Sequence, residues 1–210
     1  MELISTRAAI WDVVHTMREL TVEQILRYFR SEASKKDLLR FIAQHIKEGT
    51  FACPDYADTY LKLRADEIDE EAAASALANC KITLHQAKWE KDRASTQAKQ
   101  YNQRILTSAF WPVAELGCEV IKEVIPVNTI SKSATLLFCT MDKQHYDLTW
   151  CFIPGDIKKA SKEWSSHIYE QPINHIALVK TRELGCEALA AGFDSYCILD
   201  KDHHPQYYTE

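Results

Sequence analysis

Hydrophobic residues recur at helical spacing in three segments near the start of the chain. The pattern predicts helices over residues 5–19, 22–30 and 35–47. Thr21 and Gln24 have the spacing of a capping box, which marks the start of the second helix. The apolar stripes consist of Ile10, Val13, Val14 and Met17 in the first helix, Ile25, Leu26 and Phe29 in the second, and Leu38, Leu39, Ile42 and Ile46 in the third.

Two short strands are predicted after the third helix. Gly49 is placed to end that helix in a left-handed conformation, and residues 51–54 and 59–63 then favour extended structure. A polar tip containing Asp55 and Asp58 connects the two strands. Three short helices followed by a hairpin predict a winged helix-turn-helix domain over residues 1–64.

The middle of the chain has the composition of a helical connector. Residues 66–103 contain neither glycine nor proline and are rich in Ala, Glu, Lys and Gln. We expect a long helix here, with a break near Ser95 and Thr96, and assign residues 65–104 to the connector.

Helical and strand patterns alternate in residues 105–210, which predicts a small α/β domain at the end of an α+β chain. The predicted elements are a helix over 105–116, strands over 135–140 and 146–153, a helix over 157–169, a strand over 175–179, a helix over 184–191 and a strand over 196–199.

Charge is distributed unevenly along the 210 residues. The chain has a net charge of −5, yet residues 1–64 hold 10 Lys and Arg against 9 Asp and Glu, a net of +1. Residues 105–210 hold 9 against 14, a net of −5. The net charge of the whole chain is therefore compatible with a basic surface in the first domain and an acidic surface in the last.

Composition excludes several common kinds of site. The seven cysteines are scattered without a C-x-x-C pair, so we expect free thiols rather than a zinc site. The five glycines form neither G-x-G nor a phosphate loop, and no Ser/His/Asp or Cys/His motif is present. We predict no cofactor, no metal and no catalytic residue. The absence of both an 18-residue apolar run and a signal peptide favours a cytoplasmic protein without a membrane partner.

The face of the third helix opposite its apolar stripe has the composition of a DNA-reading surface. Basic side chains suit phosphates, and a glutamine suits an adenine edge. Thr21 and nearby backbone amides of the second helix could hold a phosphate. Asp37 on the same side opposes DNA contact, as do the acids of the wing tip. The predicted DNA-binding residues are Thr21, Lys36, Arg40, Gln44 and Lys47.

The order of elements in the last domain resembles the core of the restriction-endonuclease-like fold. That fold carries Glu-x-Lys on its third strand, where this chain has Asp147-Leu148-Thr149 and lacks the lysine. Glu115, Asp142 and Asp147 could gather a metal, but solvated strand ends are the simpler interpretation. His203 and His204 are interpreted in the same way, as part of a solvated tail.

Several segments resemble an uncharacterised winged-helix plus α/β-domain family encoded on bacterial conjugative and other mobile elements. The similar segments are ELTVEQILRYF, KEGTF, AFWPVAEL, YDLTWCFIP, HIALV and YCILDKDHHPQYY. The family in turn resembles replication-relaxation proteins. The resemblance implies DNA binding through the first domain and an inactive, degenerate nuclease-like second domain.

The sequence thus predicts a non-enzymatic DNA-binding accessory or regulatory protein of a mobile element, acting in replication or transcription. Weak binding by one unit favours a homodimer or a larger assembly on duplex DNA. The first alternative is an interaction module whose acidic last domain recruits a basic replication or relaxase partner. The second alternative is a metal-dependent nuclease.

Overall fold

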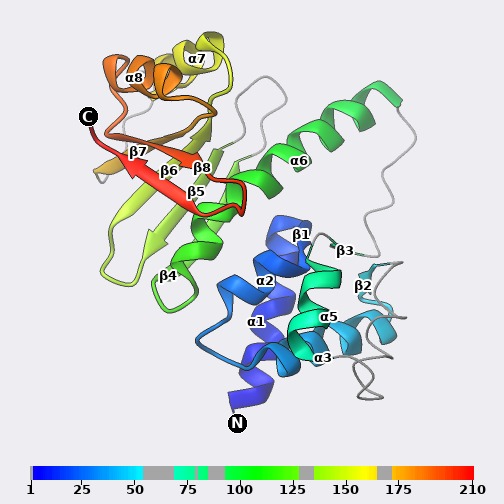
Figure 1. The fold of residues 1–210 in the computed structure, drawn as a ribbon. Helices are drawn as coiled ribbons and strands as arrows, with labels where there is room; N and C mark the ends of the chain where they lie inside the picture. Colours follow the sequence, from blue (N-terminus) through cyan, green and yellow to red (C-terminus); the bar gives the residue numbers. More distant parts are fainter. Residues whose placement is uncertain (1, 54–68, 79, 85–92, 128–134, 165–171) are drawn as a thin grey trace. The chain divides into compact units, whose positions relative to one another are not determined.

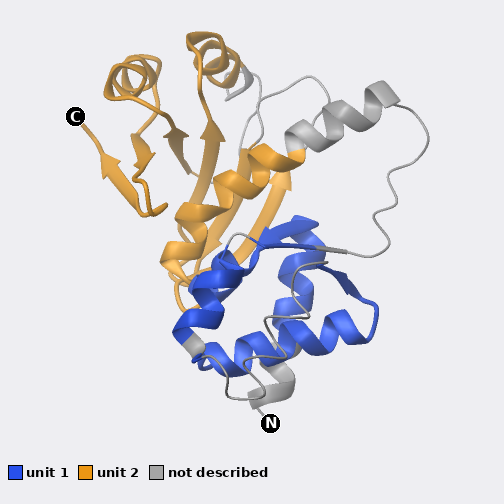
Figure 2. Ribbon diagram, turned by 45° about the vertical axis from the view of Figure 1, so that its right-hand side comes forward, with its two compact units in different colours: residues 1–96 blue, residues 97–210 orange. Residues whose placement is uncertain are grey.

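The computed structural model describes residues 2–53, 69–78, 80–84, 93–127, 135–164 and 172–210. The chain divides into two compact units, residues 1–96 and residues 97–210 (Figures 1 and 2). We call them unit 1 and unit 2. Their boundary falls within the connector that the sequence analysis assigned to residues 65–104. Helices and strands are both abundant, which confirms the α+β class.

Unit 1 combines short helices with a three-stranded antiparallel sheet in the order β1-β3-β2. A capping box starts α2, as the sequence predicts: Thr21 accepts a hydrogen bond from the Gln24 amide, and the Gln24 side chain accepts one from the Thr21 amide. The elements are α1 (Glu2–Met17), β1 (Glu19–Thr21), α2 (Val22–Tyr28), α3 (Lys35–Lys47), β2 (Phe51–Ala52), α5 (Glu70–Leu77) and β3 (Lys81–Leu84).

The bounds of the first helix differ from the expected ones. Helix α1 begins at Glu2 and ends at Met17, whereas the sequence predicted residues 5–19. The third helix agrees with the prediction, spanning Lys35–Lys47 and ending at Gly49, whose φ of 71° is left-handed.

The expected long helix over residues 66–103 is wrong. Residues 81–84 form β3, which lies between β1 and β2 and pairs with both. Thr21 pairs with Lys81, and Phe51 pairs with Leu84. Since these partners are far away in the sequence, sheet formation overrides the local helical propensity. The second hairpin strand expected at 59–63, with Asp55 and Asp58, lies outside the described residues. The break expected near Ser95 and Thr96 does not occur, because both residues lie within the continuous helix α6 (Arg93–Leu116).

Unit 2 is a six-stranded mixed sheet with helices packed on both of its faces. The strands follow the chain in the order β4-β5-β6-β7-β8-β9. Pairing is parallel for β6 with β7 and β7 with β8, and antiparallel for the others. The elements are α6 (Arg93–Leu116), β4 (Ile121–Val127), β5 (Thr135–Thr140), β6 (His145–Trp150), α7 (Pro154–Trp164), β7 (Ile173–Leu178), α8 (Arg182–Ala190), β8 (Ser195–Leu199) and β9 (Pro205–Tyr208).

Neighbouring residues of β7 show which helices cover which face. Ala177 packs in a cluster with Ile157 of α7 and Ala188 of α8. Ile176, which points to the opposite face, lines a pocket with Leu116 of α6. The five elements from β5 to α8 were predicted from the sequence, and so was β8. The edge strands β4 and β9 were not predicted.

Candidate nucleic-acid interface

One face of α3 belongs to the core of unit 1 and the other is open to solvent. Leu38, Leu39 and Ile42 are completely buried. Ser34 caps the helix, since its hydroxyl accepts a hydrogen bond from the Asp37 amide at 3.2 Å. Burial of the apolar stripe therefore fixes the rotation of α3 and presents its polar residues outward.

Three of the predicted DNA-binding residues are exposed cations on α3. Lys36, Arg40 and Lys47 are all exposed, and Arg40 keeps 61% of its side chain in solvent. A helix rises about 1.5 Å per residue, so Lys36 and Lys47 are separated by roughly 16 Å along its axis. These residues, which we call the α3 ridge, span a length comparable to the width of the DNA major groove, about 12 Å.

Two carboxylates accompany the α3 ridge. A guanidinium nitrogen of Arg40 lies 3.6 Å from Asp37, one helical turn away. Gln44 is half-buried, and its side-chain amide donates a hydrogen bond to Glu48 at 2.8 Å. Gln44 must therefore break its hydrogen bond to Glu48 before it can contact an adenine. The ion pair between Arg40 and Asp37 is exposed, so breaking it costs little free energy.

Thr21 lies in the cap of α2 rather than on an exposed surface. The residue is 9% exposed, and its hydroxyl accepts the Gln24 amide at 3.2 Å. The next amides are also engaged: Val22 donates to the carbonyl of Cys80 at 2.9 Å, and Glu23 donates to that of Ala78 at 3.2 Å. The carbonyls of Ala78 and Cys80 thus accept from the amides that were expected to hold a phosphate, which makes a structural role for Thr21 the simpler interpretation.

An acidic neighbour of α3 was missed by sequence reasoning. The ammonium group of Lys35 lies 2.6 and 2.7 Å from the two carboxylate oxygens of Glu71, which belongs to α5. Helices α2, α3 and α5 together enclose a pocket of about 470 Å³ that also contains Arg27 and Arg30. The acidic run at residues 66–71 is visible in the sequence, but the position of Glu71 beside Lys35 depends on the packing of α5.

The acids considered for a nuclease site are held by different partners. The Asp147 carboxylate lies 2.6 Å from Nδ1 of His175, and Asp142 accepts a hydrogen bond from Thr140. Glu115 lies 3.3 Å from Nδ1 of His204. Within the ranges described above, no group of three or more His, Cys, Asp or Glu side chains could hold a metal ion. The arrangement gives no support to a metal-dependent nuclease.

The end of the chain is packed and is not a solvated tail. His203 stacks on Trp111 of α6 with 4.4 Å between ring centres. Residues 205–208 form β9, which pairs with β8. The prediction for His203 and His204 was wrong because the paired strand returns the chain onto unit 2.

All seven cysteines are free, and the most buried ones are poor nucleophiles. Burial raises the pKa of Cys197 to about 12. Burial also raises the pKa of Cys151, and the charges of Asp156 and Asp147 add to the effect. Since the thiolate is the reactive form, neither of these residues suits nucleophilic chemistry at neutral pH.

No helix in the described ranges is long and apolar enough to cross a membrane. Comparison with known proteins found nothing similar to this chain: no family model, no curated protein and no solved structure matches it.

Proposed function

We propose that unit 1 is a winged helix-turn-helix domain that binds duplex DNA through α3, and that the protein is a non-enzymatic accessory or regulatory factor. The observation that carries the proposal is the α3 ridge. Lys36, Arg40 and Lys47 lie exposed on a helix whose opposite face is fixed in the core. A rigid helix with cations on its free face is the form in which many proteins enter the major groove.

The order of elements in unit 1 supports this assignment. Helices α2 and α3 are joined by the turn of residues 29–34, as in a helix-turn-helix pair. The chain then enters β2, and β2 pairs with β3 beside β1. In this interpretation β2 and β3 are the two paired strands that flank the wing.

The charges of the α3 ridge set the expected strength of binding. Each neutralised phosphate lowers the slope of log K against log salt by about 0.9, so three contacts give a slope of roughly −2.7. Affinity then falls roughly 40-fold between 50 and 200 mM salt. Because one unit binds weakly on this basis, we propose that two copies act together on two half-sites.

Unit 2 then serves a role other than catalysis. Its antiparallel strands β4, β5 and β6 precede the parallel strands β7 and β8, which supports a degenerate restriction-endonuclease-like core. The third strand carries Asp147 and Thr149 and no lysine. The proposed setting is a mobile genetic element, as the resemblance of the sequence implies.

A salt-dependent binding assay tests the proposal. Fluorescently labelled random duplexes and the upstream DNA of the element are titrated with the full chain at several salt concentrations. We expect binding at low salt, a slope near −3 per copy, and tighter binding to the element's own DNA. Failure to bind any duplex at low salt would contradict the proposal and favour a protein-interaction role.

A further inference from the structure

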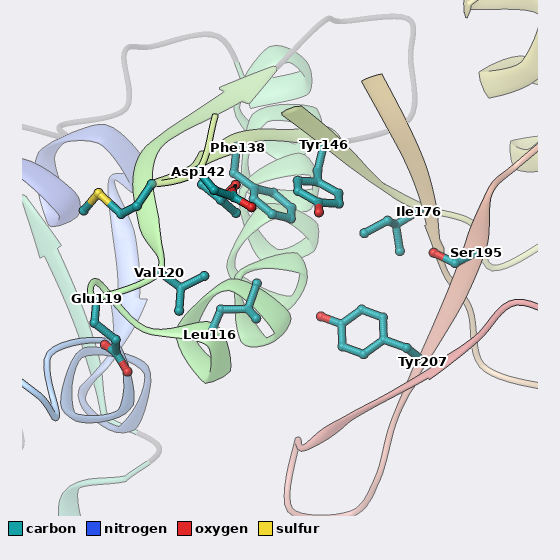
Figure 3. A pocket seen from close by; sticks show the side chains of 11 residues that line it. Leu116, Glu119, Val120, Phe138, Asp142, Tyr146, Ile176, Ser195 and Tyr207 are labelled. Carbon is teal, nitrogen blue, oxygen red and sulfur yellow. Dashed lines mark hydrogen bonds between the residues drawn. The ribbon is translucent and has the colours of Figure 1, made fainter. Parts of the chain in front are cut away.

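Unit 2 contains a pocket of about 540 Å³ that neither α3 nor the proposed DNA contact uses. It lies on the α6 face of the sheet, where strands β5, β6, β7, β8 and β9 meet the end of α6. Figure 3 shows the hydroxyl ends of Tyr146 and Tyr207 pointing into the space between Leu116 and Ile176. Pockets of this size and composition commonly hold ligands or anchoring side chains.

The pocket is apolar inside and acidic at one side. Leu116, Val120, Phe138 and Ile176 contribute apolar walls. Asp142 lies on the side opposite Tyr207, and Glu119 lies on the same side with its carboxylate turned toward Gly117 (Figure 3). None of the described residues that line the pocket is basic. A group entering this space therefore meets aromatic rings, with the Asp142 carboxylate at one side, which is a favourable environment for a cation.

The mouth of the pocket carries exposed apolar side chains. Met141 is 57% exposed, Tyr207 44% and Val120 37%, and all three line the pocket. Only two other large hydrophobic residues of the described chain are exposed to a similar degree, Ile125 and Ile153. A ligand confined to the pocket would not require an apolar rim, whereas a protein partner would cover it. Tyr and Met are enriched in protein interfaces for this reason.

We propose that this pocket binds a basic segment of a protein partner, with an arginine side chain that enters beside Tyr146 and reaches toward Asp142, and with flanking apolar residues on the rim. Arginine fits because its planar guanidinium stacks on aromatic rings and pairs with carboxylates. Asp142 accepts the hydroxyl of Thr140, which positions the carboxylate at the turn between β5 and β6. The site is independent of the proposed DNA contact, since it uses residues of unit 2 alone.

Three fluorescein-labelled peptides test the inference by anisotropy with the full chain. The first has an Arg flanked by Leu residues, the second has Gln in place of Arg, and the third has Glu. We expect the arginine peptide to bind about threefold to tenfold more tightly than the glutamine peptide, as one or two partly exposed ion pairs would give. The double variant Glu119→Gln, Asp142→Asn should remove that preference, and Met141→Ser should weaken all of the peptides.

A matched control separates the pocket from general attraction to an acidic protein. Glu187→Gln combined with Glu210→Gln removes the same charge from exposed positions outside the pocket lining. We expect this control to keep the arginine preference and all variants to keep the same unfolding temperature. Equal binding of the arginine and glutamine peptides, or equal losses in the control and pocket variants, would overturn the inference. Binding of benzamidine without binding of any of the three peptides would also overturn it, since the site would then hold only a small cation.

Discussion

The ammonium group of Lys35 lies within 2.7 Å of both carboxylate oxygens of Glu71, so α5 neutralises the first cation of α3. The pair is solvent-exposed, with 46% of the Lys35 side chain and 78% of the Glu71 side chain accessible. Its contribution to stability is therefore small. If α3 binds DNA as proposed, the Glu71 carboxylate would compete with a phosphate for Lys35.

Replacing Glu71 with Gln should strengthen DNA binding. The substitution removes a negative charge and frees Lys35 for a phosphate contact, so we expect about a twofold to fivefold gain in affinity and a steeper salt slope. Glu187→Gln makes the same change of charge on α8 and should leave affinity almost unaltered. The two variants are compared by anisotropy at low salt, and equal gains would contradict a local effect of Glu71.

Removing two cations of the α3 ridge should weaken binding at every sequence. For Lys36→Ala combined with Arg40→Ala, we expect the salt slope to fall in magnitude by about 2, because two phosphate contacts are lost. Lys158→Ala combined with Lys159→Ala removes the same charge from the exposed side of α7 and serves as the control. An unchanged slope in the first variant would exclude α3 as the DNA-binding element.

Thr21 should prove to be a structural residue. Loss of its hydroxyl in Thr21→Ala leaves the α2 amides without their cap and should cost about 1 kcal/mol. Hydrogen exchange of α2 measures this directly, and we expect faster exchange in Thr21→Ala than in Thr21→Ser. DNA affinity of the folded protein should stay within about twofold. A large loss of affinity without faster exchange would instead place Thr21 on a phosphate.

Asp147 should matter for stability and not for phosphodiester cleavage. The carboxylate is 1% exposed and contacts His175, so Asp147→Asn should destabilise unit 2 by about 1–3 kcal/mol. Plasmid incubated with the protein and Mg²⁺ or Mn²⁺ should remain intact. Cleavage that disappears in Asp147→Asn, but persists in Asp142→Asn, would support the nuclease alternative.

Two glycines of unit 2 should respond differently to alanine. A Cβ at Gly185 of α8 would overlap the buried ring of Tyr196, so Gly185→Ala should cost about 1–3 kcal/mol. A Cβ at Gly155 in the first turn of α7 meets only Ile153, at 3.7 Å. Gly155→Ala should be neutral or stabilising by up to about 1 kcal/mol, because alanine favours the helix. Urea titration of both variants measures the difference.

The cap of α2 and the extent of α3 could be predicted because their determinants are close in sequence. The Thr21 and Gln24 side chains satisfy each other's backbone amides within one turn, and Leu38, Leu39 and Ile42 repeat at the helical period. Strand β5 was likewise predicted from an apolar run next to a turn, and so was β6, although the predicted range 146–153 extended beyond the end of β6 at Trp150. Lys36, Arg40 and Lys47 were recognised by the same periodicity, because burial of one face exposes the other.

The surroundings of that face could not be predicted. Residues 81–84 have no local signal that excludes a helix, and their extended form depends on pairing with Thr21 and Phe51. Glu71 reaches Lys35 only because α5 packs on α2 and α3. The pocket of unit 2 also draws its lining from α6 and five strands, so no single segment contains its pattern.

By itself, the sequence determined those features that depend on residues only a few positions apart. These are the cap of α2, the apolar stripes of the helices and the cations of α3. Only the tertiary structure decided that residues 81–84 form a strand and that β9 pairs with β8. It also decided which residues lie next to Glu71, Asp147 and Tyr207. The physical reason is that sheet pairing and side-chain packing join residues far apart in the chain. Their free energy exceeds local conformational preference, and it has no signature in any one window of sequence.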